Sequence, residues 1–210
     1  HYTGAADSHW GELEVVRESL VEELRASGAA PYGIPIGGST PVGAVGYAAA
    51  LFEMSEQFAA AGIEPVAIVH TSSSGGTHAG LVAGRALLRE RGHHVPEVLA
   101  IGVAKGVNMG LPDVAEMARD TVEMLGGSRD LVEPGDVQID PDWMGEDYAV
   151  PTRAGDAAIR WAATHGGWVL DRTYSGKGFA GLIGNAEAGR WRPGGDVVFV
   201  HTGGQPAIFA

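Results

Sequence analysis

The feature that most constrains the fold of this chain is a glycine- and hydroxyl-rich turn between an apolar run and a helix-like run. The apolar run is PVAIV at residues 65–69, and the turn HTSSSGGTHAG at residues 70–80 follows it at once. Small and apolar residues at three- and four-residue spacing continue to about Arg91, which predicts a helix. The order strand, turn, helix is typical of a βα unit.

This turn has the composition of an anion-binding site. Glycine lets the backbone approach a ligand closely, and the free N–H groups at the start of a helix face an anion. Ser73, Ser74 and Thr77 add hydroxyl donors. The turn therefore predicts a phosphate cradle. The alternative is that Ser and Gly only form a loop and that Thr77 only caps a helix.

Strands and helices alternate from residue 28 to the end of the chain. This alternation predicts an α/β fold, a mostly parallel twisted sheet with helices on both faces. Ligands bind such sheets at the carboxyl ends of the strands, so we expect the turns at 37–40, 71–77, 173–176 and 202–204 to converge on one site. The predicted helices cover residues 11–27, 42–61, about 79–91, 114–125, 152–163 and 177–188, and the predicted strands cover 31–36, 65–70, 98–104, 168–171 and 197–201. The irregular segment 127–151 is either functional or contains a short strand near 137–139.

Composition excludes several classes of function. The net charge of −12 argues against binding to nucleic acid or to an anionic membrane surface. The chain has no cysteine, so it has no disulfide, thiolate metal site or thiol nucleophile. No apolar run approaches the roughly 20 residues of a membrane span, and nothing resembles a signal peptide. We expect a cytoplasmic protein without a metal site.

Two further features leave alternatives open. The spacing GKGFAG at residues 176–181 matches a dinucleotide fingerprint, but an acidic residue at the end of a following strand is missing. A nicotinamide-dinucleotide enzyme is therefore the weaker alternative. Tyr148 and Tyr174 each lie in a turn next to an apolar segment. Each is either a buried ring with a satisfied hydroxyl or a phenol that stacks on a planar ligand or transfers a proton.

Five motifs taken together resemble one family. The family is that of D-cysteine desulfhydrase and 1-aminocyclopropane-1-carboxylate deaminase, pyridoxal-phosphate enzymes with the tryptophan-synthase-β-like fold (fold type II). The resemblance covers essentially the whole chain. The motifs, in chain order, are GGS at 37–39 with Gly43 and Gly46-Tyr47, SGGTHAG at 74–80, EDYAVP at 146–151, DRTYSGK at 171–177 and HTGG at 201–204.

The resemblance implies a cofactor, pyridoxal 5′-phosphate, and a role for each matching residue. Tyr148 and Tyr174 would lie near substrate and ring, where either could transfer a proton or position the substrate carboxylate. Thr202 would face the pyridine nitrogen. A neutral hydroxyl there disfavours protonation of the ring and favours β-elimination. The remaining cofactor-binding residues would be Ser74, Gly75, Gly76 and Thr77 at the phosphate, together with Ser175.

Two positions favour the desulfhydrase branch over the deaminase branch. They are Ser175, where the deaminases look like Glu, and Thr202, where they tend to carry an aliphatic residue. A lyase of this branch would remove the α-proton of a small amino acid, expel a β-substituent such as sulfide, and release ammonia and pyruvate.

The largest departure from the family is the absence of its Schiff-base lysine. That lysine lies in an N-terminal Ser/Gly-Asn-Lys segment, which this chain does not contain. Neither Lys105 nor Lys177 stands in such a context, and the resemblance implies that Lys177 is structural. The chain therefore resembles the C-terminal two-thirds of such an enzyme. Residues 1–40 would end the small domain, and residues 41–210 would form most of the large cofactor-binding domain.

These expectations lead to two readings of function. The first is a lyase that is inactive as this chain alone and needs a chain that supplies the N-terminal segment; the family also implies a homodimer. The second is a non-catalytic module or pseudo-enzyme that binds a phosphate-bearing ligand.

Overall fold

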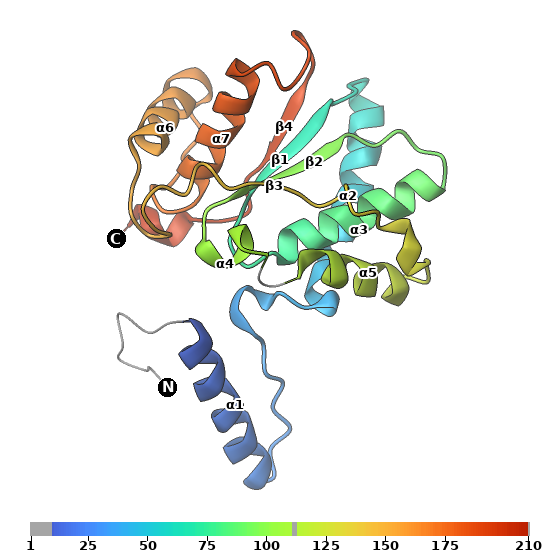
Figure 1. The fold of residues 1–210 in the computed structure, drawn as a ribbon, viewed down its shortest axis with the longest axis vertical. Helices are drawn as coiled ribbons and strands as arrows, with labels where there is room; N and C mark the ends of the chain where they lie inside the picture. Colours follow the sequence, from blue (N-terminus) through green and yellow to red (C-terminus); the bar gives the residue numbers. More distant parts are fainter. Residues whose placement is uncertain (1–9, 111–112, 210) are drawn as a thin grey trace.

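A four-stranded parallel sheet forms the centre of the molecule (Figure 1). The computed structural model describes residues 10–110 and 113–209. The strands lie in the order β3-β2-β1-β4, and every neighbouring pair is parallel. This arrangement confirms the predicted α/β class with a parallel sheet. The strands are β1 (Ala67–Ser72), β2 (Glu97–Gly102), β3 (Gln138–Asp140) and β4 (Val197–Val200).

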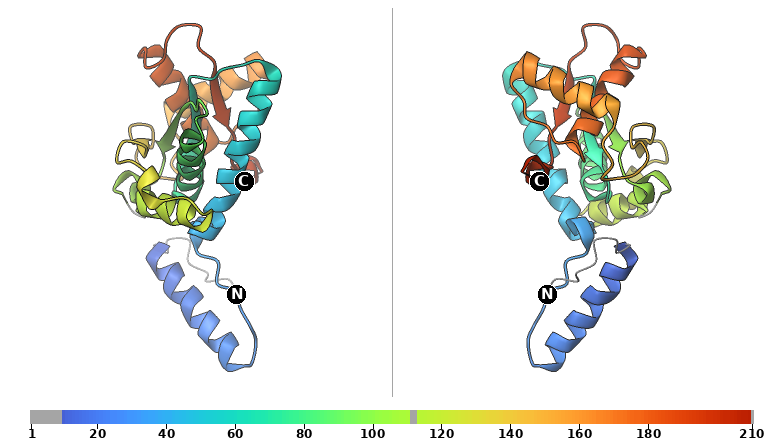
Figure 2. Two further views of the ribbon diagram at one scale, coloured as in Figure 1. Left: turned by 90° about the vertical axis from the view of Figure 1, so that its right-hand side faces the viewer. Right: turned by 90° about the vertical axis from the view of Figure 1, so that its left-hand side faces the viewer.

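Helices cover both faces of the sheet, as predicted (Figures 1 and 2). On one face, Ile68 of β1 packs in a cluster with Leu81 of α3. On the other face, Val69 packs in a cluster with Leu99 of β2, against which Leu182 of α7 lies. β1 is buried on both faces along its whole length, which explains why the apolar run at residues 65–69 continues into its first half. The helices of the first face are α2 (Pro41–Ala61), α3 (Gly76–Glu90) and α5 (Val114–Met124), and those of the second are α6 (Arg153–Gly166) and α7 (Ser175–Glu187).

Side-chain caps fix where three of these helices begin. Thr40 accepts a hydrogen bond from Gly43 N at 3.1 Å at the start of α2, and Thr152 accepts one from Gly155 N at 2.9 Å at the start of α6. Asp113 accepts one from Glu116 N at 3.0 Å at the start of α5. Each cap satisfies a backbone donor that the first turn of a helix leaves free.

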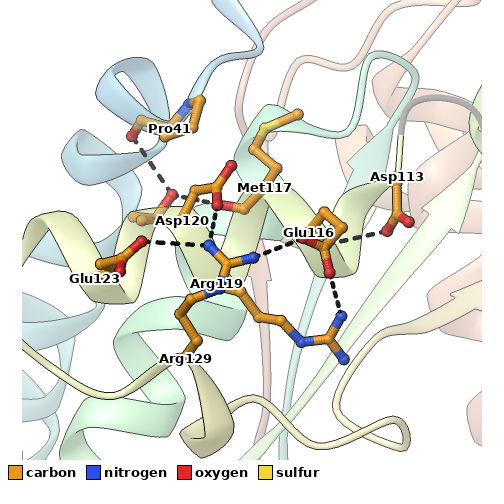
Figure 3. Close-up of polar contacts among 9 residues, drawn as sticks. Pro41, Asp113, Glu116, Met117, Arg119, Asp120, Glu123 and Arg129 are labelled. Carbon is orange, nitrogen blue, oxygen red and sulfur yellow. Dashed lines mark hydrogen bonds and ion pairs between the residues drawn. The ribbon is translucent and has the colours of Figure 1, made fainter.

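An ion-pair cluster holds α5 to the short 3-10 helix η2 (Arg129–Leu131), as Figure 3 shows. The Arg129 guanidinium donates to Asp120 and, at 2.6 Å, to Glu116. Glu116 also accepts from Arg119 at 2.7 Å. These side chains are half-exposed, so the cluster orients a turn and contributes little stability.

Helix α1 (Trp10–Ala26) stands apart from the sheet and its helices (Figures 1 and 2). It contacts the segment that leads to α2: Ile36 N donates to Glu14 Oε1 at 2.9 Å, and Arg17 Nη1 donates to Gly33 O at 3.2 Å. The division into residues 1–40 and 41–210 stays a prediction. Residues 1–9, 111–112 and 210 of those two ranges lie outside the described residues.

Two predicted strands are wrong. Residues 31–36 run without a strand ladder and end in the 3-10 helix η1 (Ile36–Gly38). Pro31 and Pro35 remove two backbone donors there, and side chains of α1 take up other backbone groups. Residues 168–171 also form no strand, and Trp168 and Val169 are exposed. Among the described residues, their one hydrogen bond to the chain at the end of β4 joins His201 Nε2 to Val169 O at 3.1 Å, and Leu170 packs in a cluster with Phe199.

Four short helices among the described residues were not predicted. They are α4 (Lys105–Asn108) and the 3-10 helices η1, η2 and η3 (Gln205–Ile208). Each holds only about one turn of chain, too short for apolar periodicity to reveal. Among the residues that the structure describes, no helix is long and apolar enough to cross a membrane.

Candidate active site

A cavity of about 430 Å³ lies where β1 and β4 end. All four turns that the sequence placed at strand ends contribute to it. No lysine, arginine or histidine is among the described lining residues, and one acidic residue, Asp171, is. The lining residues are Gly37, Tyr47, Ser73, Ser74, Thr77, Tyr148, Asp171, Thr173, Tyr174, Thr202, Gly203, Gly204 and Ala207.

The floor of the cavity on one side is the turn between β1 and α3. Gly75 adopts a left-handed conformation with φ of +84°, which a residue with a side chain rarely tolerates, and α3 begins at the next residue. Ser74 packs so closely against Gly37 that a Cβ atom on Gly37 would lie 2.1 Å from Ser74 Oγ. Gly76 N donates to Ser39 Oγ at 3.2 Å, so the turns at 37–40 and 71–77 are hydrogen-bonded to each other.

The hydrogen-bond donors that this turn presents to an anion are neutral groups and not cationic side chains. The hydroxyl-bearing residues Ser73, Ser74 and Thr77 line the cavity, and the 15-residue helix α3 begins beneath them. The N-terminal end of a helix of this length carries a partial positive charge. The geometry therefore fits a phosphate group.

Asp171 organises the opposite wall. Its buried carboxylate accepts four hydrogen bonds. Thr173 N and Tyr174 N donate to Oδ2 at 2.8 and 2.7 Å, and Ser175 N and Ser175 Oγ donate to Oδ1 at 2.7 and 2.6 Å. A Cβ atom on Gly204, where φ is +105°, would lie 1.9 Å from Asp171 Oδ1. Asp171 thus sets the turn before α7 and requires glycine in the turn after β4.

The two predicted tyrosines both lie on the cavity. Tyr174 donates its hydroxyl hydrogen to Thr71 O at 2.8 Å, and burial raises its pKa to about 12. Burial also raises the pKa of Tyr148, and the negative charge of Asp171 adds to that shift. Both phenols are therefore protonated at neutral pH.

Thr202 carries a buried hydroxyl without a proper partner. Its Oγ1 is near the Tyr174 hydroxyl, yet it makes no hydrogen bond of normal geometry with any described residue. A buried hydroxyl without a partner is costly, which points to a ligand atom as its partner. The ring nitrogen of a pyridine can accept from this hydroxyl. The cavity residues therefore fit pyridoxal phosphate at two points, the phosphate cradle and Thr202.

Ser175 is the one predicted cofactor-binding side chain that does not line the cavity. It is buried, and its hydroxyl is committed to Asp171. Gly75 and Gly76 form the backbone of the phosphate turn. Sequence reasoning missed Asp171, although a detectable signal was present: an acidic residue followed by a short polar turn favours side-chain-to-backbone hydrogen bonds.

Lys177 points away from the cavity. Its ammonium group donates to the carbonyl oxygens of Met144, Asp147 and Tyr148 at 2.7–2.8 Å, and burial lowers its pKa. It fastens the loop that carries Tyr148 to α7. Lys105 pairs with the Asp147 carboxylate at 2.6 Å and does not line the cavity either.

The glycines that match a dinucleotide fingerprint serve helix packing. A Cβ atom on Gly178 would lie 1.9 Å from Thr71 Oγ1, and one on Gly181 would lie 2.7 Å from Ile101. A Cβ atom on Gly176 would lie 2.5 Å from Asp171 O. Gly178 and Gly181 let α7 approach the sheet, Gly176 lets it approach the preceding turn and α6, and none of them lines the cavity.

Comparison with known proteins agrees with this geometry. The chain is 36% identical over 192 residues to D-cysteine desulfhydrase of Serratia proteamaculans and 35% identical over 193 residues to that of Klebsiella pneumoniae. These matches cover 91% and 92% of this chain but 56% of each relative, so the chain spans little more than half their length.

A solved structure described as an ACC deaminase homologue has the same fold. It superposes with a TM-score of 0.83 at 30% identity, over 97% of this chain and 58% of that chain. This confirms the fold class that the sequence motifs implied. The family profile described as "Pyridoxal-phosphate dependent enzyme" matches residues 8–203. The chain belongs to this family of pyridoxal-phosphate dependent enzymes.

Proposed function

We propose that the protein acts as a pyridoxal-phosphate lyase on a small amino acid, in the manner that the name D-cysteine desulfhydrase describes. The observation that carries the proposal is the cavity itself. It combines a cation-free phosphate cradle with the unpartnered Thr202 hydroxyl, and two protonated tyrosines lie on its wall.

Each group of residues has a distinct task in this proposal. The turn Ser74-Gly75-Gly76-Thr77 binds the phosphate, and Thr202 binds the ring nitrogen. The bound cofactor supplies an aldehyde for the substrate amine and an electron sink for the bond that breaks at Cα. Tyr148 and Tyr174 hold or move protons at their hydroxyl oxygens, and Asp171 keeps Tyr174 in place.

The chain itself offers no amine to the cofactor aldehyde. Lys177 and Lys105 are the only lysines of the sequence, and both are committed elsewhere. We therefore propose that a lysine from outside these 210 residues completes the site and that the 210-residue chain alone is inactive as a lyase. The homodimer and the cytoplasmic location stay predictions.

A binding experiment separates the cradle from the rest of the site. The purified chain is titrated with pyridoxal phosphate and with pyridoxal, and binding is followed by equilibrium dialysis. We expect pyridoxal phosphate to bind at least about tenfold more tightly, because lost hydrogen bonds to a charged group cost about 1.5–3 kcal/mol. Thr77→Val should reduce the difference in affinity between pyridoxal phosphate and pyridoxal. Thr173→Val, on the opposite wall of the cavity, should leave that difference unchanged. Equal affinity for the two compounds would contradict the cradle.

An activity measurement tests the missing amine. The same chain, loaded with pyridoxal phosphate, is assayed for sulfide release from D-cysteine. We expect none above the rate of free pyridoxal phosphate. Turnover by the chain alone would refute the proposed inactivity while leaving the cofactor site intact.

The absence of an amine at the cavity also favours a second candidate function, that of a non-catalytic module that binds a phosphate-bearing ligand. A protein that carries the Ser/Gly-Asn-Lys segment decides between the two. If its addition restores sulfide release, the lyase stands. If no such protein restores activity while the phosphate compound still binds, the module is favoured.

A further inference from the structure

Two buried histidines lie beneath the cavity and have no task in the proposed function. His70 belongs to β1, and His78 lies in the first turn of α3, directly after Thr77 of the phosphate cradle. Both are fully buried. Their ring centroids are 5.1 Å apart, and His70 Nε2 lies 3.0 Å from His78 Nδ1. Neither ring lines the cavity.

The surroundings fix which ring nitrogens carry hydrogen. His70 Nδ1 lies 2.9 Å from Thr71 O, and a carbonyl oxygen only accepts, so Nδ1 carries a hydrogen. Burial lowers the pKa of His70 to about 4 and that of His78 well below its usual value, so both rings are neutral at pH 7. His70 Nε2 is then an acceptor, and the hydrogen between the rings belongs to His78 Nδ1. His78 Nε2 is bare and has no described partner.

The hydrogen bonds of the two histidines lead to the Thr71 carbonyl oxygen, which also accepts a hydrogen bond from Tyr174. The Thr71 carbonyl accepts from His70 at 2.9 Å and from the Tyr174 hydroxyl at 2.8 Å. A carbonyl oxygen has two lone pairs, so these two donors use both. The hydroxyl hydrogen of Tyr174 therefore points into the protein, and the lone pairs of its oxygen face the cavity, where the hydroxyls of Ser73 and Thr202 lie near it.

We propose that His70 and His78 are positioning residues that hold the Thr71 carbonyl in place as the acceptor of the Tyr174 hydroxyl hydrogen, so that Tyr174 presents an acceptor to its ligand. The group that Tyr174 recognises is then a hydrogen-bond donor, such as a protonated amine, and not a carboxylate. The inference rests on the proposed function only in that Tyr174 faces a ligand.

The first test measures the ring tautomers in the unmodified chain. Nitrogen-15 histidine labelling and long-range proton–nitrogen NMR distinguish a hydrogen on Nδ1 from one on Nε2. We expect both buried rings to carry hydrogen on Nδ1 at pH 7. A hydrogen on His70 Nε2 would overturn the inference.

The second test compares two substitutions of His78, one whose side chain can donate a hydrogen bond and one whose side chain cannot. The amide nitrogen of Asn can replace Nδ1 as a donor, whereas Leu cannot donate. The readout is the carbon-13 resonance of the Tyr174 Cζ atom, assigned with Tyr174→Phe. We expect His78→Leu to move this resonance toward that of the exposed Tyr32, and His78→Asn to leave it near its original position.

The controls separate positioning from packing. His94→Asn, at an exposed histidine, should leave the Tyr174 resonance unchanged. If His78→Leu does not fold, His70→Asn and His70→Leu repeat the comparison one step nearer to Thr71. The inference fails if His78→Leu leaves the resonance in place or if both substitutions move it equally. All readouts are taken without cofactor, so they do not depend on whether the chain binds pyridoxal phosphate.

Discussion

At the scale of single residues, the buried histidines set how the stability of the chain depends on pH. The folded pKa of His70 is about 4, below the unfolded value of about 6.5, because burial disfavours the charged ring. The depressed pKa means that the unfolded chain binds more protons, so stability is full above about pH 6.5 and is lost as the pH falls toward 4. The contribution of His70 that is lost between pH 7.5 and pH 5 is about 2 kcal/mol.

Denaturant unfolding at pH 7.5 and pH 5 measures this loss. His70→Asn should reduce the difference between the two pH values by about 2 kcal/mol, because Asn does not titrate, and the buried His78 keeps its own contribution. His93→Asn, at an exposed ring, should retain it. A wild-type chain whose free energy of unfolding is the same at both pH values would contradict the burial of neutral histidines.

The buried Thr202 hydroxyl lowers the stability of the ligand-free chain and is available to bind a ligand. Its hydroxyl has no partner of normal geometry among the described residues, so Thr202→Val removes an unsatisfied buried group and keeps the shape of the side chain. We expect the free energy of unfolding of the ligand-free chain to stay constant or to rise by about 1 kcal/mol. The affinity for pyridoxal phosphate should fall. Thr173→Val is the comparison, because the Thr173 hydroxyl is not a buried group without a partner. A loss of stability in Thr202→Val alone would contradict the interpretation that the Thr202 hydroxyl is unsatisfied.

At the scale of elements, the contact between α2 and α3 depends on glycine at one face of α3. A Cβ atom on Gly80 would lie 2.3 Å from Ala44 O, a backbone atom of α2 that cannot move without moving the helix. Gly80→Ala should therefore destabilise the chain by about 2 kcal/mol or more.

Gly46 of α2 provides the matched control, because nothing lies within 4 Å of a Cβ atom there. Gly46→Ala should stabilise the helix by about 0.5–1 kcal/mol through the higher helix propensity of alanine. Thermal unfolding of both variants checks the pair. The packing argument is wrong if the two substitutions change the melting temperature in the same direction.

Periodicity predicted those elements whose apolar residues meet the sheet. β1 and β2 are buried on both faces and show as apolar runs, and caps at Thr40 and Thr152 mark the helix starts. Residues 168–171 also look like a strand, but hydrogen bonding to a neighbour defines a strand, and a sequence does not contain the neighbour. The same reason explains the error at residues 31–36, where α1 takes the backbone hydrogen bonds.

At the scale of the whole molecule, the candidate site could be predicted in part because Ser74, Thr77 and Thr202 follow β1 and β4 and because motifs identified Tyr148 and Tyr174. Ser74, Thr77, Tyr148, Tyr174 and Thr202 all meet at one cavity. Asp171 had a local signal that was overlooked, since its donors lie within four residues of it. The histidine pair could not be found in this way, because its role depends on how α3 folds back onto β1 and on the contact between Tyr174 and Thr71. His78 meets His70 across α3 and β1, and Tyr174 reaches a carbonyl 103 residues away.

The composition of the cavity wall has a consequence for how ionic strength acts on the cofactor. Most phosphate sites lose affinity as salt rises, because salt weakens attraction to Lys and Arg. Here none of the described lining residues is cationic, and the chain carries a net charge of −12. A doubly charged phosphate ester approaches against repulsion and is then held by neutral N–H and hydroxyl donors. Added salt screens the long-range repulsion more than it weakens the short hydrogen bonds to the phosphate, so binding of pyridoxal phosphate should become faster and tighter as ionic strength increases.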